Sequence, residues 1–147
     1  ELVYTNAGHN PPYLRRRDGA IEHLDQRHGP ALGVIEGITY KENKLILQTG
    51  DILVTYTDGV TEAMNPTYDL FSEERFLDLL QSDRYHSAEE VITLTVEAVN
   101  QFQGSADQAD DLTMLSLQYL RQSTSTADPL EIAINNEALS SLREQWK

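Results

Sequence analysis

The chain has 147 residues, 39% of them hydrophobic, and its 24 acidic and 11 basic side chains give a formal net charge of −13. Such a negative surface repels nucleic-acid backbones and anionic lipid headgroups, so we expect neither nucleic acid nor a membrane as a partner. The sequence contains no cysteine, which excludes disulfides and thiolate chemistry and favours the reducing cytoplasm as the location.

The first half of the chain is rich in β-forming segments. Residues 2–5 form a short apolar run, and the Asp-Gly pair at 18–19 separates two apolar runs. That pair predicts an antiparallel hairpin with a two-residue turn, in which both central residues adopt positive φ. Residues 38–47 are again rich in β-formers. Residues 52–57 are apolar or β-favouring on both faces, which predicts a strand in the middle of a covered sheet.

Two amphipathic helices are predicted in the second half, over residues 73–81 and 88–103. The Ser87 hydroxyl can cap the longer helix, and Glu90 can reciprocate. Apolar side chains occupy one broad half of this helix, which therefore packs on a sheet or another helix. They are Val91, Ile92, Leu94, Val96, Ala98, Val99 and Phe102. Residues 112–119 alternate in polarity and predict a final strand.

The chain divides by composition into a domain over residues 1–120, a linker and a tail. Residues 121–129 are small and polar, which is typical of a linker. The tail, 130–147, contains a strand-like run at 130–134 and the start of a helix from 136. These two elements either pack on the domain or open a second one.

Acidic side chains flank two of the predicted strands. Asp58 follows the strand at 52–57, and Asp110 and Asp111 precede the strand at 112–119. If the two strands are antiparallel neighbours, the end of one and the start of the other share a sheet edge, and Asp58 and Asp110 come close together. Carboxylates so placed favour a hard cation such as Mg²⁺ or Mn²⁺. An alternative stays open, because Asp-Gly is also a common turn and Asp-Asp a common solvated loop.

Four sequence motifs occur in a fixed order: Asn-Ala-Gly-His-Asn-Pro-Pro at 6–12, Gly-Pro-Ala-Leu-Gly-Val at 29–34, a Gly-Asp…Thr-Asp-Gly…Glu-Ala run at 50–63, and Asp-Asp-Leu-Thr at 110–113. In this order and spacing the chain resembles bacterial SpoIIE/RsbU-type serine phosphatases, of the PPM or type 2C class, over about residues 1–120. The resemblance implies an α+β fold, an α-β-β-α sandwich with a binuclear Mn²⁺ or Mg²⁺ site at one edge. It also implies hydrolysis of phosphoserine or phosphothreonine by a metal-activated water, which needs no cysteine.

The resemblance also implies roles for individual residues. Asp58 matches the metal-binding aspartate of the family's Thr-Asp-Gly motif, and Asp110 matches the first, metal-binding residue of its Asp-Asp/Asn-x-Thr motif. These two are the expected catalytic metal ligands. Gly59 and Asp111 are the expected cofactor-binding neighbours: Gly59 lets the backbone pass close to the site, and Asp111 adjoins a ligand.

Two further acidic motifs of the family, which supply its other metal ligands, do not occur in these 147 residues. The chain therefore resembles the C-terminal part of a phosphatase domain. We expect it to bind metal weakly, because such sites depend on ligand number and fixed geometry, and to be inactive or weakly active alone. We also expect it to expose an apolar sheet face or to self-associate as a homo-oligomer.

The resemblance implies a phosphorylated anti-anti-sigma (STAS-domain) protein as the substrate and partner, which is an inference by association. The tail at 130–147 faintly resembles the opening strand and helix of an anti-sigma kinase-type ATP-binding domain. A second hypothesis of a different class is a non-catalytic regulatory module, in which a sheet edge or the helix at 88–103 binds a partner protein and the acidic residues are merely solvated.

Overall fold

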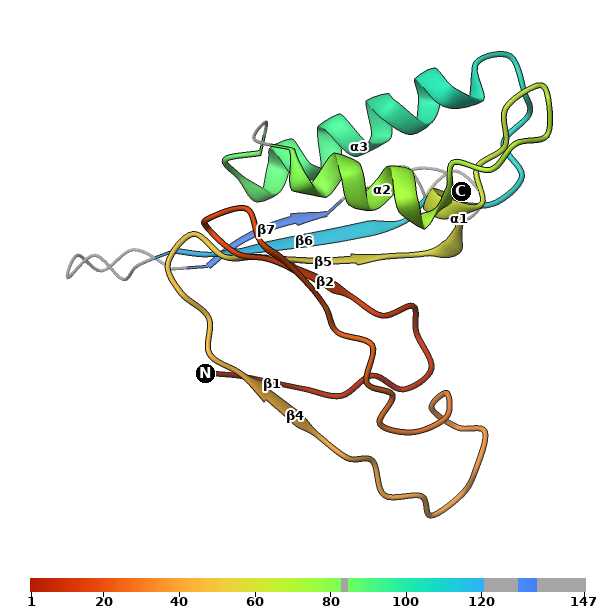
Figure 1. Cartoon of the computed structure of the whole chain (residues 1–147). Coiled ribbons are helices and arrows are strands. Elements are labelled where there is room, and N and C mark those ends of the chain that lie inside the picture. Colours follow the sequence, from red (N-terminus) through yellow and green to blue (C-terminus); the bar gives the residue numbers. More distant parts are fainter. Residues whose placement is uncertain (83–84, 121–129, 135–147) are drawn as a thin grey trace, which may run out of the picture.

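Seven strands form two antiparallel sheets in the computed structural model, which describes residues 1–82, 85–120 and 130–134 (Figure 1). The smaller sheet pairs β1 (Leu2–Tyr4) with β4 (Asn43–Leu45). The larger has the order β3-β2-β5-β6-β7. Its strands are β2 (Tyr13–Arg15), β3 (Ile21–His23), β5 (Ile52–Tyr56), β6 (Met114–Tyr119) and β7 (Leu130–Ile134).

Three helices accompany these sheets: α1 (Asp58–Thr61), α2 (Ser72–Gln81) and α3 (Ala88–Gln103). Figure 1 shows α2 and α3 together on one face of the five-stranded sheet, with the β1–β4 pair on the other side. The α+β fold predicted from the sequence is confirmed. Within the described part of the chain, no helix is long and apolar enough to cross a membrane.

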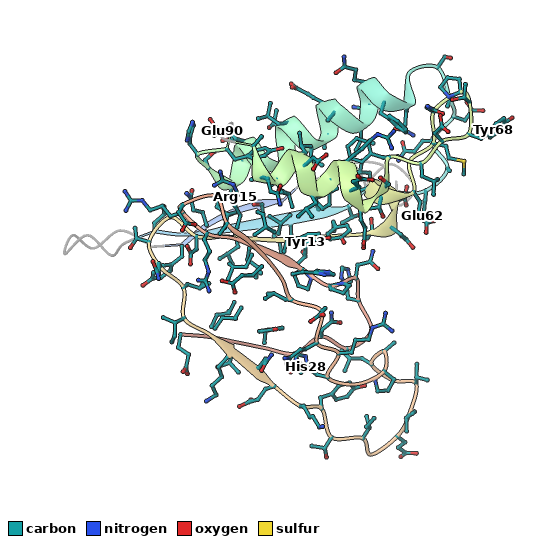
Figure 2. The ribbon with its side chains drawn as sticks, viewed as in Figure 1. Tyr13, Arg15, His28, Glu62, Tyr68 and Glu90 are labelled. Carbon is teal, nitrogen blue, oxygen red and sulfur yellow. The ribbon has the colours of Figure 1, made fainter. Side chains whose placement is uncertain are left out.

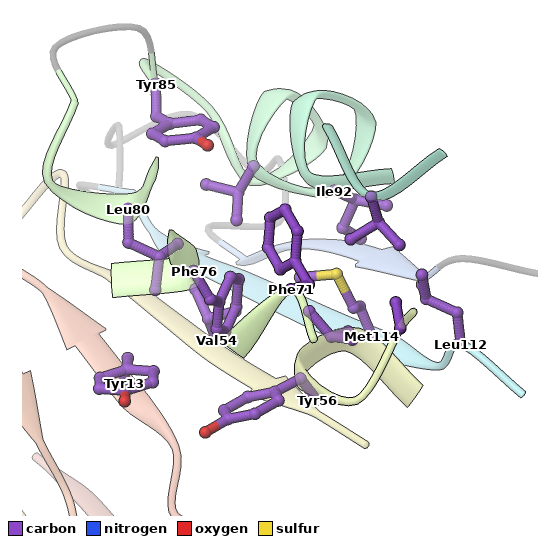
Figure 3. Packing of buried hydrophobic residues seen from close by; sticks show 14 of the residues in the cluster. Tyr13, Val54, Tyr56, Phe71, Phe76, Leu80, Tyr85, Ile92, Leu112 and Met114 are labelled. Atoms are coloured by element: carbon purple, nitrogen blue, oxygen red, sulfur yellow. The ribbon is translucent and has the colours of Figure 1, made fainter. Parts of the chain in front are cut away.

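The core lies between the helices and the central strands (Figure 3). Side chains alternate across a strand, so the first, third and fifth residues of β5 are buried against the helices, while the two between them are half-buried. Tyr56 packs edge-on against Phe76 of α2 at a ring-centroid distance of 4.8 Å, and Tyr13 stacks beside Tyr56 at 5.8 Å. The strand at 52–57 is central, as predicted, but only its helix-facing side is fully covered.

The hairpin between β2 and β3 differs from the predicted two-residue turn. The Gly19 amide donates to the Arg16 carbonyl at 2.9 Å, and the Arg16 amide donates to the Ala20 carbonyl at 2.7 Å. Gly19 has a φ of 90°, whereas Asp18 is not among the residues with positive φ. This is a longer turn closed by one left-handed glycine, which also matches the right-handed twist of the strands. The prediction of positive φ at both residues is wrong.

Helix α3 begins at the predicted serine cap, but the reciprocal bond of Glu90 goes to the residue before the cap and not to Ser87. The Ser87 Oγ accepts a hydrogen bond from the Glu90 amide at 3.1 Å, and the Glu90 carboxylate accepts one from the His86 amide at 2.6 Å. Its fully buried stripe is narrower than the predicted apolar face, since Leu94 and Phe102 are only half-buried. That stripe also contains two polar residues; its members are Ala88, Val91, Ile92, Thr95, Val99 and Gln103.

The strand-like run at 130–134 forms β7, which pairs with β6 from Leu115↔Ile134 to Tyr119↔Leu130. It therefore packs on the domain as the fifth strand of the larger sheet. The predicted linker at 121–129 and the predicted helix from 136 lie outside the described residues. By contrast, only Asn43–Leu45 of the β-rich stretch at 38–47 forms a strand.

The face of the larger sheet opposite the helices carries partly exposed apolar side chains. On β6, Leu115 and Tyr119 are 37% and 36% exposed, while the residues between them that face the helices are buried. Beside the smaller sheet, Ile46 is 66% exposed. The open apolar surface expected from the sequence is therefore present on this side of the molecule.

Candidate active site

The end of β5 and the start of β6 lie side by side at one edge of the larger sheet, where α1 begins (Figure 1). Tyr56 is paired with Met114 across the antiparallel ladder. Beyond this pair, the Thr57 amide donates to the Thr113 carbonyl at 3.0 Å, and the Thr57 hydroxyl accepts from the Thr113 amide at 3.1 Å. The same hydroxyl donates to the Asp111 carbonyl at 3.0 Å. The two strands are therefore antiparallel neighbours, which is the condition under which Asp58 and Asp110 were expected to come close together.

Asp58 and Asp110 each lie one residue away from the Thr57–Asp111 hydrogen bond. Both carboxylates belong to exposed residues, and the Asp58 carboxylate makes no hydrogen bond within the described part of the chain. One Asp110 carboxylate oxygen accepts from the Asp111 amide at 2.7 Å, and the Gln108 side chain donates to the Asp110 carbonyl at 2.9 Å. The segments that carry the predicted ligands therefore meet at one edge of the sheet, with their carboxylates open to solvent. We call this end of β5 and start of β6, with Asp58 and Asp110, the acidic edge.

Gly59 allows α1 to contact the segment that precedes β6. A β-carbon on Gly59 would overlap the Asp111 carbonyl oxygen and would lie 2.8 Å from the Asp111 carbonyl carbon and 3.2 Å from the Leu112 nitrogen. These are backbone atoms, so no side-chain rotation could relieve the contact. Gly59, the residue after Asp58, therefore lies directly against the backbone of Asp111, the residue after Asp110. Its role beside a metal site stays a prediction.

The donors at this edge suit a hard divalent cation only in part. Carboxylate oxygens are the ligands that Mg²⁺ and Mn²⁺ prefer, and Asp58 and Asp110 present two carboxylates that no basic side chain of the described chain pairs with. Across residues 1–82, 85–120 and 130–134, however, no three or more His, Asp or Glu side chains group closely enough to hold a metal ion. The edge therefore fits part of a ligand set.

A pocket of about 160 Å³ with both polar and apolar lining residues adjoins the same edge, between α1, the end of α3 and the loop before β6. Gly59 and Asp110 belong to its wall, together with Glu62 and Gln103 (Figure 2 labels Glu62). Sequence reasoning did not identify this pocket. A signal was present nevertheless, because Gln103 continues the i, i+4 spacing of the buried stripe of α3 with a polar residue where an apolar one is expected.

Tyr56 directly precedes this edge and belongs to the core. Burial, followed by the charges of Tyr13 and Glu73, raises the pKa of the Tyr56 hydroxyl above its ordinary value. Burial likewise raises the pKa of Tyr13, and Glu73 adds to the effect. Both hydroxyls are therefore protonated at neutral pH, and neither acts there as a base.

The motif at 6–12 forms a structural turn, as expected. The Asn6 side chain accepts from the His9 amide at 2.9 Å and donates to the His9 carbonyl at 3.0 Å. The Asn6 amide donates to Nδ1 of the buried His28 ring at 2.8 Å. These bonds tie the turn after β1 to the loop after β3.

The chain matches one protein-family model and several known proteins. The model of the family described as Stage II sporulation protein E (SpoIIE) matches residues 1–120. Protein IcfG of Synechocystis is 34% identical over 116 residues, which are 79% of this chain and 18% of that protein. Phosphoserine phosphatase RsbU of Bacillus subtilis is 29% identical over 119 residues, 80% of this chain and 34% of RsbU. The chain thus spans about a fifth to a third of these relatives.

Solved structures share the fold. The RsbU and RsbW domains of a Mycobacterium tuberculosis protein match with a TM-score of 0.62 at 28% identity, over 97% of this chain and 38% of that one. The SiaA-PP2C domain of Pseudomonas aeruginosa matches with a TM-score of 0.59 at 26% identity, over 77% and 45%. With strands, acidic edge and family model in agreement over residues 1–120, the chain belongs to the SpoIIE family of PPM, or PP2C-type, phosphatase domains.

Proposed function

We propose that this chain supplies one side of the active site of a metal-dependent protein phosphatase, with Asp58 and Asp110 as ligands of a Mn²⁺ or Mg²⁺ ion. The observation that carries this proposal is the 3.0 Å hydrogen bond from Thr57 to Asp111, which joins the two acidic segments at one edge. Family membership supports it, because the relative RsbU is named a phosphoserine phosphatase. Gly59 and Asp111 directly follow the two ligands in the sequence, and their backbone contact keeps the two acidic segments together.

The chemistry divides between the cation and this chain. A divalent cation in such a site lowers the pKa of a water and neutralises charge on phosphoryl oxygens. Asp58 and Asp110 provide oxygen donors and negative charge from two different segments. Thr57 and Gly59 keep those segments in contact through a hydrogen bond and a close backbone approach. A phosphoserine or phosphothreonine ester is the bond to be hydrolysed, and no residue of this chain acts as a nucleophile.

By itself this chain has little or no phosphatase activity. A binuclear site needs more ligands than the two aspartates at this edge, and the described residues contain no group of three that could hold a metal. Affinity for hard cations depends on the number of ligands and on the rigidity of the site. We expect weak binding of one cation and slow turnover.

The substrate that we propose is a phosphorylated anti-anti-sigma (STAS-domain) protein. RsbU and RsbP of B. subtilis are named phosphoserine phosphatases. These names support a phosphoserine ester as the bond that is hydrolysed, and they do not identify the substrate protein. Residues 130–147 are proposed to open an anti-sigma kinase-like domain whose first strand, β7, pairs with β6 of the larger sheet. The M. tuberculosis structure that combines RsbU and RsbW domains and matches 97% of this chain supports that order of domains.

The test combines Mn²⁺ binding with turnover by the whole chain. Broadening of backbone amide NMR signals by paramagnetic Mn²⁺ detects weak binding, and hydrolysis of p-nitrophenyl phosphate and of a phosphoserine peptide measures activity. We expect broadening around Gly59 and Asp111 that is lost in Asp58→Asn and in Asp110→Asn, with little turnover. The matched control is Asp107→Asn, which removes an exposed carboxylate from the same loop and leaves the broadening unchanged.

Three outcomes contradict the proposal. Broadening that persists in both ligand variants places the ion elsewhere. Fast turnover that survives Asp58→Asn shows that the acidic edge is not the site. Absence of any Mn²⁺ effect favours the non-catalytic interaction module instead.

We also propose that the exposed apolar face containing Leu115 and Tyr119 lets the chain self-associate. Sedimentation velocity then shows dimers or larger species at raised concentration. A strictly monomeric profile without binding of a hydrophobic dye contradicts this part of the proposal.

A further inference from the structure

The loop between α1 and α2 presents an aromatic side chain to solvent. Tyr68 is 84% exposed, more than any other large hydrophobic residue of the described chain. Pro66 and Leu70 on either side of it are exposed as well, and a bridge between Met64 and Leu70 closes the loop. Figure 2 shows Tyr68 directed away from the ribbon, at the end of the molecule where Glu62 also lies. We call Pro66, Tyr68 and Leu70 the apolar tip.

The backbone holds Tyr68 in a conformation that tyrosine rarely adopts. Its φ is 63°, in the left-handed region where the β-carbon of an L-residue is crowded. Such conformations persist only where the surroundings impose them, and they gather at sites that contact ligands. Because the ring is almost wholly exposed, the fold gains little packing in return for this strain. Tyr68 is therefore placed for a contact outside the chain.

Hydrogen bonds within the loop impose this conformation. The Asn65 side-chain oxygen accepts from the Thr67 amide at 3.0 Å and from the Asp69 amide at 2.9 Å. The Tyr68 amide donates to the Asn65 carbonyl at 2.9 Å. One Asp69 carboxylate oxygen accepts from the Thr67 hydroxyl at 2.8 Å. The apolar tip is thus preorganised, so a partner that binds Tyr68 does not first have to order the loop.

The apolar tip adjoins the acidic edge. Met64, where the loop begins, lines the same pocket as Gly59 and Asp110, so a polypeptide that reaches the edge also reaches the tip. A tyrosine ring offers a large contact area with little entropy to lose, and tyrosine is enriched among the residues that dominate binding at protein interfaces. With proline and leucine beside it, the ring favours an aliphatic side chain as its partner.

We propose that Tyr68 contacts an aliphatic side chain of the phosphorylated protein substrate, close in sequence to the phosphoserine that lies at the acidic edge. Tyr68 is then a residue that determines specificity, because substrates with an aliphatic residue at the right spacing bind more tightly. The link to phosphoserine rests on the proposed function, whereas the apolar contact at the tip does not.

The test uses NMR of the whole ¹⁵N-labelled chain in excess Mg²⁺, titrated with two sets of phosphoserine peptides. In one set a single leucine stands from two to six residues on either side of the phosphoserine, among glycines and serines. In the other set a serine replaces that leucine. We expect at least one leucine peptide to shift the backbone signals of Tyr68 and Gly59 and to bind on the order of tenfold more tightly than its serine counterpart, as burial of one leucine predicts.

Tyr68→Gly removes the ring and suits the left-handed backbone. We expect its urea midpoint to be no lower than that of the parent, while the preference for leucine disappears. Leu32→Ser is the matched control, because it removes an apolar side chain that is 77% exposed on another loop, and it keeps the preference.

Four outcomes overturn the inference. They are the lack of any preference for leucine, a preference that survives Tyr68→Gly, an equal loss in Leu32→Ser, and a lower urea midpoint in Tyr68→Gly, which would assign the ring to the fold. Loss of concentration-dependent association in Tyr68→Gly, without loss of peptide binding, would assign the tip to a second copy and overturn it too. Equal binding of the unphosphorylated leucine peptide would refute the proposed function and leave the contact at Tyr68 standing.

Discussion

Replacing Gly59 by alanine tests whether close backbone contact assembles the acidic edge. The added β-carbon would overlap the Asp111 carbonyl and would lie 3.2 Å from the Leu112 nitrogen. Because these are backbone atoms, relief requires α1 and the segment before β6 to separate. Overpacking of this kind costs about 1–3 kcal/mol. The helix propensity of alanine returns up to about 1 kcal/mol, and less in a helix that has only four residues.

We therefore expect Gly59→Ala to lower the free energy of unfolding by about 1–2 kcal/mol, which for a chain of this size corresponds to a fall in Tm of about 3–8 °C. The separation should also weaken Mn²⁺ binding, because Asp58 and Asp110 move apart. Urea unfolding followed by circular dichroism measures the first effect, and Mn²⁺ broadening of the Asp111 amide signal measures the second.

Gly33→Ala is the matched control for this experiment. Gly33 has a φ of +83°, and a β-carbon there meets nothing within 4 Å. The substitution costs about 1–2 kcal/mol for left-handed backbone alone, so stability falls while Mn²⁺ broadening stays the same. A Gly59→Ala protein that is as stable as the parent and keeps its Mn²⁺ broadening would refute the reasoning.

Three further predictions concern the scaffold. Asp51 is 1% exposed and accepts hydrogen bonds from Arg16 Nη1 at 2.7 Å and the Gln48 amide at 2.8 Å. Asp51→Asn should lower the free energy of unfolding in urea by about 2–3 kcal/mol, because hydrogen bonds to a buried charge are lost. Ser87→Ala removes the cap of α3 and should cost about 1 kcal/mol by the same measurement. Burial and nearby charge raise the pKa of Tyr56 in the folded state, so its contribution to stability is complete below the ordinary tyrosine pKa of about 10 and is lost as the pH rises above it. Unfolding midpoints measured from pH 8 upward should therefore fall less steeply in Tyr56→Phe than in the parent.

Each of these has a matched control. Glu22→Gln removes the exposed partner of Arg16 and should cost less than about 1 kcal/mol, so equal losses in Glu22→Gln and Asp51→Asn would contradict the burial argument. Ser105→Ala, at an exposed position outside the helices, should be neutral; a similar loss there would remove the cap as the cause. For the third prediction the control is Tyr68→Phe, because Tyr68 is exposed. If Tyr68→Phe reduces the fall of the unfolding midpoint above pH 8 as much as Tyr56→Phe does, burial of Tyr56 is not the cause.

Local patterns were sufficient to predict most of the regular structure. The alternation at 112–119, the apolar run at 52–57 and the serine before α3 each predicted an element that the structure contains. These signals are legible because strand and helix periodicity and capping depend on residues within a few positions of one another. The turn at 18–19 was mispredicted because Asp-Gly fits more than one hairpin geometry, and the choice depends on how the flanking strands pair.

The sequence by itself determined the family resemblance over residues 1–120 and the residues proposed to carry the chemistry, which are two aspartate motifs beside strands on an acidic chain. It did not determine what surrounds them. The contact between Gly59 and Asp111, the tie through Thr57 and the pocket around Gln103 join segments that lie about 40 to 55 residues apart. Such contacts depend on the register of β5 against β6 and on the packing of α3 over both strands, and no pattern within one segment encodes these, because each is the joint result of many weak interactions across the whole fold.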